Sequence, residues 1–133
     1  MSTWLLKTEP SEYSFADLEK EERAVWTGVR NALAQKHLRA IAKGDELLVY
    51  HTGSEKAVVG IARAVSGPYP DPKQPKLACI DLAPERRLAR PVTLAELKAA
   101  PEFADFALVR LPRLSVVPVP APIRARLLER AAR

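Results

Sequence analysis

The chain has 133 residues and a formal net charge of +5, and its single cysteine, Cys79, excludes an intrachain disulfide. That cysteine usage, the absence of a cationic leader and the lack of any run of about 18 apolar residues predict a cytoplasmic protein with no membrane partner. The length favours a single domain, residues 1–133, whose core is large enough to fold without disulfides or structural metals.

The first thirty residues predict two short strands separated by a helix. The apolar run at residues 4–7 is typical of a short buried strand. Ser14 followed by Asp17 is a capping-box pattern, which predicts a helix that ends near residue 22. Residues 23–26 predict a second short strand, and residues 27–28 a turn.

The middle of the chain predicts one helix and two strands. Asn31 is a suitable N-cap for a helix whose apolar side chains recur at i, i+4 and i+7. The residues of that inward face are Ala34, Leu38 and Ile41. Residues 46–50 predict a strand, and the nearly continuous apolar run at 57–64 predicts a strand in a central position of the sheet.

One strand and one helix are predicted between residues 65 and 99. Residues 67–72 contain a glycine and three prolines, which indicate a loop. Residues 77–82 predict a further strand. Thr93 and Glu96 form a second capping box, and the helix that they begin should end near residue 99.

The end of the chain predicts a late strand at residues 113–117 and a final helix at 122–130. The inward face of this helix carries Ile123, Leu127 and Leu128. Its outward face carries Arg124, Arg126 and Arg130. Five or six short strands with three or four short helices do not suit a doubly wound sheet, in which a full helix follows each strand. We expect an α+β fold with a small, strongly bent sheet or open barrel.

The positive charge is concentrated late in the sequence. Residues 86–133 hold ten Lys+Arg and four Asp+Glu, whereas residues 1–85 hold eleven and twelve. Nine of the ten later cations are arginines, whose fixed fork of donors suits phosphates. The alternative is that these arginines are only a solvated surface.

Several kinds of chemistry have no sequence signal. Two histidines, His37 and His51, and one cysteine provide none of the paired spacings of zinc ligands. The five glycines form no phosphate-binding loop. Cys79 lies inside an apolar strand, which is typical of an inert core thiol. We therefore expect no metal, no cofactor and no enzymatic activity.

Trp26, Gly28 and Asn31 stand out as a group. A tryptophan face, a carboxamide and a glycine that lets the backbone approach closely could together hold a flat, hydrogen-bonding heterocycle. The simpler interpretation makes Trp26 a core anchor and Asn31 only a helix cap. The residues alone leave both interpretations open.

Tyr50 and His51 end an apolar strand and could supply a second aromatic wall and a titratable donor. Alternatively, His51 is a solvated residue at the start of a turn. Arg30 could contact a phosphate, or it could form an ion pair with Glu9 or Glu12.

In sequence order, these motifs resemble the EVE domain family. The matching stretches are residues 4–14, 25–31, 44–51, 69–72, 90–97 and 113–116, including the segment Val25-Trp26-Thr27-Gly28-Val29-Arg30-Asn31. The resemblance implies a PUA-like fold, an open and strongly bent β-barrel of five to six short strands with peripheral short helices.

The resemblance also implies a function, since the family is thought to bind modified bases in DNA or RNA without a cofactor. By analogy, the nucleobase-binding residues would be Ser11, Tyr13, Trp26, Val29, Asn31, Tyr50, His51 and Ser115. Around this pocket we expect phosphate contacts from Arg30, Arg124 and Arg126.

Three functions follow as hypotheses. The first is a non-catalytic module that binds a modified nucleobase within nucleic acid, flipped out of the stack where the base is paired. The second is a sensor of a free nucleoside, whose binding would be nearly independent of salt. The third is a hydrolase that uses His51 with Glu9 or Glu12.

Overall fold

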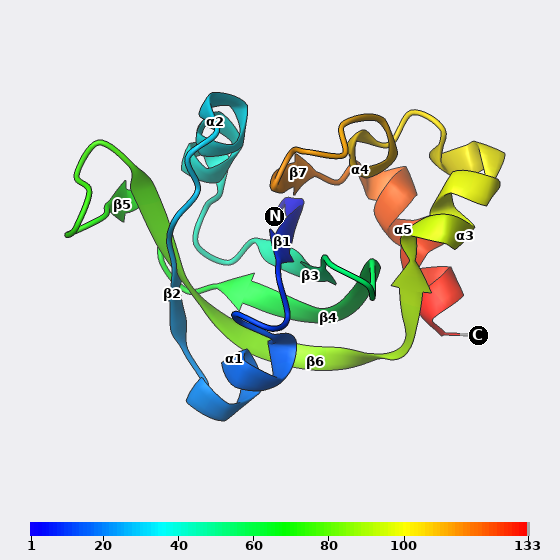
Figure 1. The fold of residues 1–133 in the computed structure, drawn as a ribbon, viewed down its shortest axis with the longest axis horizontal. Helices are drawn as coiled ribbons and strands as arrows, with labels where there is room; N and C mark the ends of the chain where they lie inside the picture. The colour runs from blue at the N-terminus through cyan, green and yellow to red at the C-terminus, as the bar shows by residue number, and fades with distance from the viewer. Residues whose placement is uncertain (133) are drawn as a thin grey trace.

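The computed structural model describes residues 1–132, which form a seven-stranded sheet with short helices at its margins (Figure 1). The strands are β1 (Thr3–Thr8), β2 (Ala24–Trp26), β3 (Glu46–His51), β4 (Ala57–Ala64), β5 (Tyr69–Pro70), β6 (Ala78–Thr93) and β7 (Val116–Pro118). The helices are α1 (Phe15–Glu21), α2 (Ala32–Ala40), α3 (Leu94–Ala99), the 3-10 helix η1 (Pro101–Phe103), α4 (Ala107–Arg110) and α5 (Ala121–Ala131). The predicted α+β open barrel is confirmed, with seven strands rather than five or six.

The strand order is β2-β6-β4-β3-β1-β7, and β5 pairs with β6 outside this path. Only β1 and β3 are parallel, while the other neighbours are antiparallel. β4 has two strands on one side and three on the other, so the predicted central position of residues 57–64 is confirmed. Figure 1 shows β6 sweeping beneath β4 and turning upward at its end, which gives the sheet its curled shape.

The bend of the sheet has its origin in the pairing of β6 with β4. The register between them shifts, so that Val59 of β4 lies opposite residues 88–91 of β6. An excess of residues on one strand bends that strand and increases its twist. Pro84 and Pro91 both lie within β6. The predicted strand at residues 77–82 is therefore only the first part of a strand of 16 residues.

Two further sequence predictions need correction. The segment 67–72 is not entirely a loop, because β5 pairs with the start of β6. The late strand is shorter than predicted and begins at Val116 instead of Arg113. The residues that precede it, from 111 to 115, instead connect the short helix α4, which was not predicted, to β7.

The predicted helix starts are confirmed by side-chain hydrogen bonds. Ser14 and Asp17 form a reciprocal capping box at the start of α1, and Thr93 and Glu96 form another at the start of α3. Asn31 caps α2, with its Oδ1 accepting from the backbone N–H of Ala34 at 3.0 Å. Each cap satisfies backbone donors that the first turn of a helix leaves unpaired.

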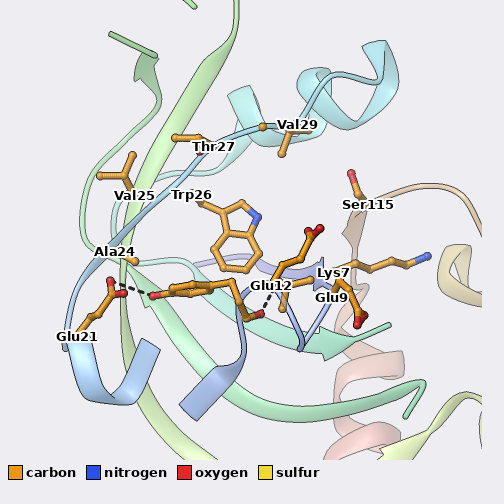
Figure 2. A pocket seen from close by; sticks show the side chains of 13 residues that line it. Lys7, Glu9, Glu12, Glu21, Ala24, Val25, Trp26, Thr27, Val29 and Ser115 are labelled. Atoms are coloured by element: carbon orange, nitrogen blue, oxygen red, sulfur yellow. Dashed lines mark hydrogen bonds between the residues drawn. The ribbon is translucent and has the colours of Figure 1, made fainter. Parts of the chain in front are cut away.

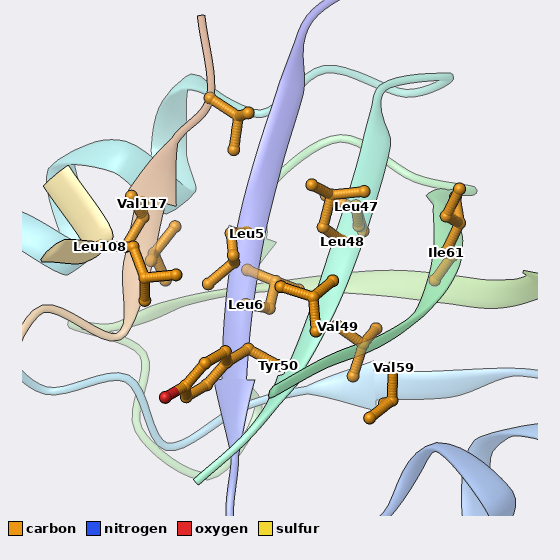
Figure 3. Close-up of a cluster of buried hydrophobic side chains, with 14 of the residues drawn as sticks. Leu5, Leu6, Leu47, Leu48, Val49, Tyr50, Val59, Ile61, Leu108 and Val117 are labelled. Carbon is orange, nitrogen blue, oxygen red and sulfur yellow. The ribbon is translucent and has the colours of Figure 1, made fainter. Parts of the chain in front are cut away.

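The core lies on the inner side of the curled sheet and includes apolar residues of β1, β3, β4 and β7 (Figure 3). Cys79 is fully buried, which agrees with a core thiol. Phe15, at the start of α1, packs directly on Gly60 of β4. A Cβ atom at Gly60 would lie 2.5 Å from the Phe15 ring, so only glycine allows α1 to sit this close to the sheet.

The final helix, α5, closes the open end of the curled sheet (Figure 1). Leu127 is fully buried, while Ile123 and Leu128 are partly buried against the core, so the predicted inward face is confirmed. None of the helices within residues 1–132 combines the length and the apolar character needed to cross a membrane.

Candidate functional site

A cavity of about 440 Å³ opens between β2 and the loop that joins β1 to α1 (Figure 2). Its walls come from three segments: the end of β1 with the following loop, the end of α1 with β2 and its continuation, and the residue before β7. The lining residues are Lys7, Thr8, Glu9, Glu12, Tyr13, Glu21, Ala24, Val25, Trp26, Thr27, Gly28, Val29 and Ser115.

Trp26 forms the flat wall of this cavity. It ends β2, where its backbone pairs with Ile80 of β6, and only 9% of the residue is exposed. Tyr13 meets the indole edge-on, with the ring centroids 6.2 Å apart and the planes at 80°. No hydrogen bond from the indole nitrogen to another residue is found within residues 1–132. The indole is thus held firmly in the core, lines the cavity, and has a nitrogen that forms no hydrogen bond within these residues.

The backbone of residues 27–29 passes over the cavity in a conformation that requires glycine. Gly28 has a φ of +78°, which L side chains rarely adopt. The next carbonyl, that of Val29, accepts a 2.6 Å hydrogen bond from the Gln35 Nε2. Gln35 is buried and also exchanges hydrogen bonds with the backbone of Ala78 in β6. Gln35 therefore fixes the segment against the sheet.

Sequence reasoning missed Gln35 altogether. The sequence feature that could have pointed to Gln35 is its position as a polar residue on the apolar face of α2, directly after Ala34. A buried polar side chain with three internal hydrogen bonds is conspicuous only once the burial is known.

Three carboxylates and one ammonium group surround the cavity. The carboxylates belong to Glu9, Glu12 and Glu21, and the ammonium to Lys7. The Tyr13 hydroxyl donates to the Glu21 Oε2 at 3.2 Å, and burial together with this carboxylate raises the pKa of Tyr13 to about 12. The phenol therefore stays neutral. The cavity has more negative than positive groups, so it favours ligand edges that donate hydrogen bonds.

Lys7 is bound at the edge of the cavity rather than projecting into it. Its Nζ donates to the Pro112 carbonyl at 2.9 Å and lies 5.7 Å from the centre of the Tyr50 ring. Burial lowers the pKa of this ammonium. Its backbone N–H donates to the Ser115 carbonyl, which joins the end of β1 to the segment before β7.

Four of the eight predicted nucleobase-binding residues line this cavity: Tyr13, Trp26, Val29 and Ser115. Ser11 lies in the same loop as Tyr13 but is exposed. Its hydroxyl donates to the Glu9 Oε1 at 2.9 Å, so its influence on the cavity passes through that carboxylate.

The prediction that Asn31, Tyr50 and His51 share one concavity with Trp26 is wrong. Asn31 caps α2 and lines a separate hollow. Tyr50 is buried behind Lys7, because β1 and β3 are parallel and place these two residues side by side.

His51 has both ring nitrogens engaged within the protein. Its Nε2 accepts from the backbone N–H of Phe15 at 3.0 Å, so its proton is on Nδ1 and donates to the Glu55 Oε1 at 2.7 Å. The side chain therefore supports the start of α1 and is not directed at the cavity.

Two of the three predicted phosphate contacts are already paired with carboxylates. Arg124 holds the buried Glu46 through a fork, with Nε to Oε1 at 2.5 Å and Nη2 to Oε2 at 3.0 Å. The prediction that Arg124 points away from the protein is thus wrong, because its guanidinium neutralises a buried carboxylate. Arg126 lies 3.5 Å from Glu102. Arg30 is exposed and has no ion pair within residues 1–132.

Arg130 was also predicted to face outward, and this is wrong as well. Its guanidinium bridges Glu96 and Glu102, and it lies 5.5 Å from the centre of the Phe103 ring. Its side chain is only 19% exposed. The arginines of α5 are therefore mostly committed to holding this helix to the rest of the molecule.

A second hollow, of about 580 Å³, contains the other tryptophan, Trp4, but its polar groups are used internally. The Trp4 Nε1 donates to the Asp45 Oδ2 at 3.0 Å, and the Ser2 backbone N–H donates to the other oxygen of this carboxylate. Arg124 lines the same hollow and is taken by Glu46. This hollow has no comparable set of free groups with which to select a ligand.

Comparison with known proteins gives consistent matches along the chain. The family model of the EVE domain matches residues 2–130. Human thymocyte nuclear protein 1 is 31% identical over 126 residues, which cover 74% of this chain and 56% of the human protein. The chain thus spans a little over half the length of that relative.

Solved structures extend the similarity to three dimensions. A protein from Rhodopseudomonas palustris, solved by NMR, matches with a TM-score of 0.95 and 38% identity over 99% of this chain and 94% of its own. The human THYN1 protein, crystallised in complex with DNA containing 5-methylcytosine, matches with a TM-score of 0.92 and 25% identity over 100% and 99%. These similarities confirm the PUA-like fold.

Proposed function

The chain belongs to the EVE domain family, and we propose that it binds nucleic acid, without catalysis, by holding one nucleobase against Trp26. The observation that carries this proposal is the cavity itself. It pairs a nearly buried aromatic wall with two polar groups, the Glu12 carboxylate and the Trp26 indole N–H, that have no hydrogen bond within residues 1–132. A volume of about 440 Å³ lies within the range typical of small-molecule pockets.

The shape of the cavity suits a flat ring. A base that stacks on the Trp26 indole would gain roughly 1–3 kcal/mol, as is common for base–aromatic stacking. A base that is paired in a duplex has to leave the stack to enter, which costs a few kcal/mol. Stacking alone offsets only part of this cost, so hydrogen bonds at the base edge and contacts with the backbone have to supply the rest.

The charges favour bases with amino groups. Glu9, Glu12 and Glu21 can only accept hydrogen bonds when ionised, so they complement the exocyclic amino groups of cytosine or adenine. Uracil and thymine present a carbonyl oxygen at the corresponding position, which a carboxylate repels. The THYN1 relative was crystallised with DNA that contains 5-methylcytosine, and a modified cytosine is the ligand that we propose to test first.

A second candidate function is the capture of a free nucleoside, and one observation favours it. The carboxylates around the cavity would repel a phosphate that lies close to its mouth. A free nucleoside would then bind at least as well as an oligonucleotide, and its affinity would not depend on salt. A hydrolase that uses His51 is not supported, because both of its ring nitrogens are engaged by Phe15 and Glu55.

The test is a binding panel with two matched tryptophan variants. Short DNA and RNA oligonucleotides carry cytosine, 5-methylcytosine, 5-hydroxymethylcytosine, adenine or N6-methyladenine at one position. Trp26→Ala should weaken binding of the preferred base by roughly 1–3 kcal/mol. Trp4→Ala removes the same side chain from the other hollow and should leave affinity unchanged. If folded Trp26→Ala protein binds the preferred base as tightly as the wild type, the proposal fails.

A further inference from the structure

Another hollow, of about 360 Å³, lies beside the Trp26 cavity and is bordered by the same two segments of the chain. Its lining residues are Asn31, Leu33, Arg110, Leu111, Pro112, Arg113 and Leu114. Val29, two residues before Asn31, lines the first cavity, and so does Ser115, one residue after Leu114. Lys7, which lines the first cavity, donates a hydrogen bond to the carbonyl of Pro112, which lines the second, so the two hollows adjoin while remaining distinct. We refer to this hollow of about 360 Å³ as the arginine ledge.

The arginine ledge exposes apolar side chains that the fold does not cover. Leu33, in the first turn of α2, is 41% exposed, and Leu111, just after α4, is 46% exposed. Only two other large hydrophobic residues within residues 1–132, Met1 and Val25, are exposed to a similar degree. Exposed apolar side chains that are scattered singly are common, whereas two that lie in one hollow are a sign of a contact surface.

The arginines of the ledge, unlike those of α5, are not committed to carboxylates. No Asp or Glu lines this hollow. Arg110 comes within 3.7 Å of Asp105, but that carboxylate is 97% exposed, and exposed ion pairs of this kind contribute little. Arg113 has no ion pair within the described part of the chain, and neither does the nearby Arg30. These cations are free to meet an anionic partner.

The two hollows carry charges of opposite sign, and this determines which of them the phosphates of a bound strand would occupy. The Trp26 cavity holds three carboxylates, so it repels phosphates while it accepts the donor edge of a base. The arginine ledge attracts phosphates and offers apolar side chains. A nucleotide whose base enters the cavity would therefore have its own and the neighbouring phosphates on the ledge.

We propose that the arginine ledge binds the sugar–phosphate backbone beside the captured base, with Arg110 and Arg113 on phosphates. Leu33 and Leu111 then pack against the sugars or bases next to the space that the captured base has left in the strand. Apolar side chains play this part in other proteins that distort DNA. This inference rests on the proposed function for the position of the captured base, but the ledge makes its own contacts.

The test compares two double variants that each remove two positive charges. Arg110→Gln with Arg113→Gln changes the ledge, and Arg86→Gln with Arg126→Gln changes two exposed arginines elsewhere. Binding of a duplex with one 5-methylcytosine is measured at several salt concentrations. The ledge variant should reduce the magnitude of the log–log salt slope by about 1.8, because each phosphate that an arginine neutralises adds ~0.9 to that magnitude. The control variant should change it by less than half of that.

The outcomes separate this proposal from the proposed function. If the wild type prefers the modified base and the ledge variant keeps the wild-type slope, phosphate binding by the ledge is contradicted and base binding by the Trp26 cavity is supported. If the wild type shows no base preference but the ledge variant has the reduced slope, phosphate binding by the ledge is supported and selective base binding by the cavity is contradicted. A wild type that binds no duplex contradicts both.

A second variant tests the apolar part of the ledge. Leu111→Ser should weaken binding of the same duplex severalfold without any change in the salt slope, because it removes apolar area and no charge. Unchanged affinity in folded Leu111→Ser protein would remove the apolar wedge from the proposal. Thermal unfolding of each variant confirms that the comparison is made between folded proteins.

Discussion

Trp4 and Trp26 each form part of a hollow, yet the two regions differ in what their polar groups do. Around Trp4, the carboxylates of Asp45 and Glu46 and the guanidinium of Arg124 are joined to each other or to neighbouring donors. Around Trp26, neither the indole N–H nor the Glu12 carboxylate has a hydrogen-bond partner within residues 1–132, while Glu9 and Glu21 accept from Ser11 and Tyr13. The two tryptophan regions therefore differ in whether nearby polar groups keep hydrogen-bonding capacity, and residue type alone does not reveal this difference.

The largest effect expected from this difference is on stability. Arg124→Ala leaves the Glu46 carboxylate buried without its cation, which should lower the free energy of unfolding by on the order of 3 kcal/mol. The same truncation at the exposed Arg113 should change it by less than about 0.5 kcal/mol. Urea unfolding of the two variants measures both values. Equal values would show that the ion pair around Trp4 has no special structural role.

The second effect is a dependence of stability on pH that belongs to the Trp4 region. The hydrogen bond from Arg124 holds the pKa of Glu46 below its usual value of 4.5. Burial opposes ionisation of Asp45, but hydrogen bonds from Ala42, Ser2 and Trp4 outweigh it and hold the pKa of Asp45 below 3.8. Because both folded pKa values are depressed, this contribution to stability is present above the unfolded values and is lost as pH falls through the folded ones.

Urea unfolding of the wild type and of Asp45→Asn at pH 7 and near pH 3 tests the contribution of this region. The wild type should be less stable at the lower pH, partly because the pKa values of Asp81 and Glu96 are also depressed, and Asp45→Asn should reduce the difference because it removes one of these carboxyls. Glu12→Gln, in the Trp26 region, is the matched control and should leave the difference unchanged. A wild-type difference that persists in full in Asp45→Asn would contradict this assignment.

The smallest effect concerns selectivity at the Trp26 cavity. Glu12→Gln keeps the size of the side chain but replaces a group that only accepts hydrogen bonds by one that also donates. Preference for cytosine over thymine should fall roughly tenfold, which corresponds to the loss of one charge-assisted hydrogen bond. Affinity for the two bases in matched duplexes measures this. An unchanged ratio would mean that other groups select the base.

Local signals in the sequence predicted much of the fold. The two capping boxes and the Asn31 cap depend on residues three positions apart, and all three are present as predicted. The strand β6 was predicted only in its first part, because its residues 83–91 include four charged side chains and two prolines and are mostly not fully buried. Their strand character comes from pairing with β4, which is a long-range property.

The site was predicted less completely, for a similar reason. Tyr13 and Trp26 both line the cavity, as the resemblance to the EVE domain family implied. The sequence could not show that Arg124 would meet Glu46, 78 positions earlier, or that His51 would be held by Phe15 and Glu55. The arginine content of the last third left a phosphate-binding surface and a merely solvated surface both open, and only the structure identifies the arginines that lack an acidic partner within residues 1–132.

The most direct test of the central proposal uses the fluorescence of the two tryptophans one at a time. Trp4→Phe leaves Trp26 as the single tryptophan, and Trp26→Phe leaves Trp4. On titration with a duplex that contains one 5-methylcytosine, the Trp4→Phe protein should lose much of its emission, since a stacked base quenches an indole in contact with it. The Trp26→Phe protein should show little change. Quenching of Trp4 but not of Trp26 would contradict the proposed site.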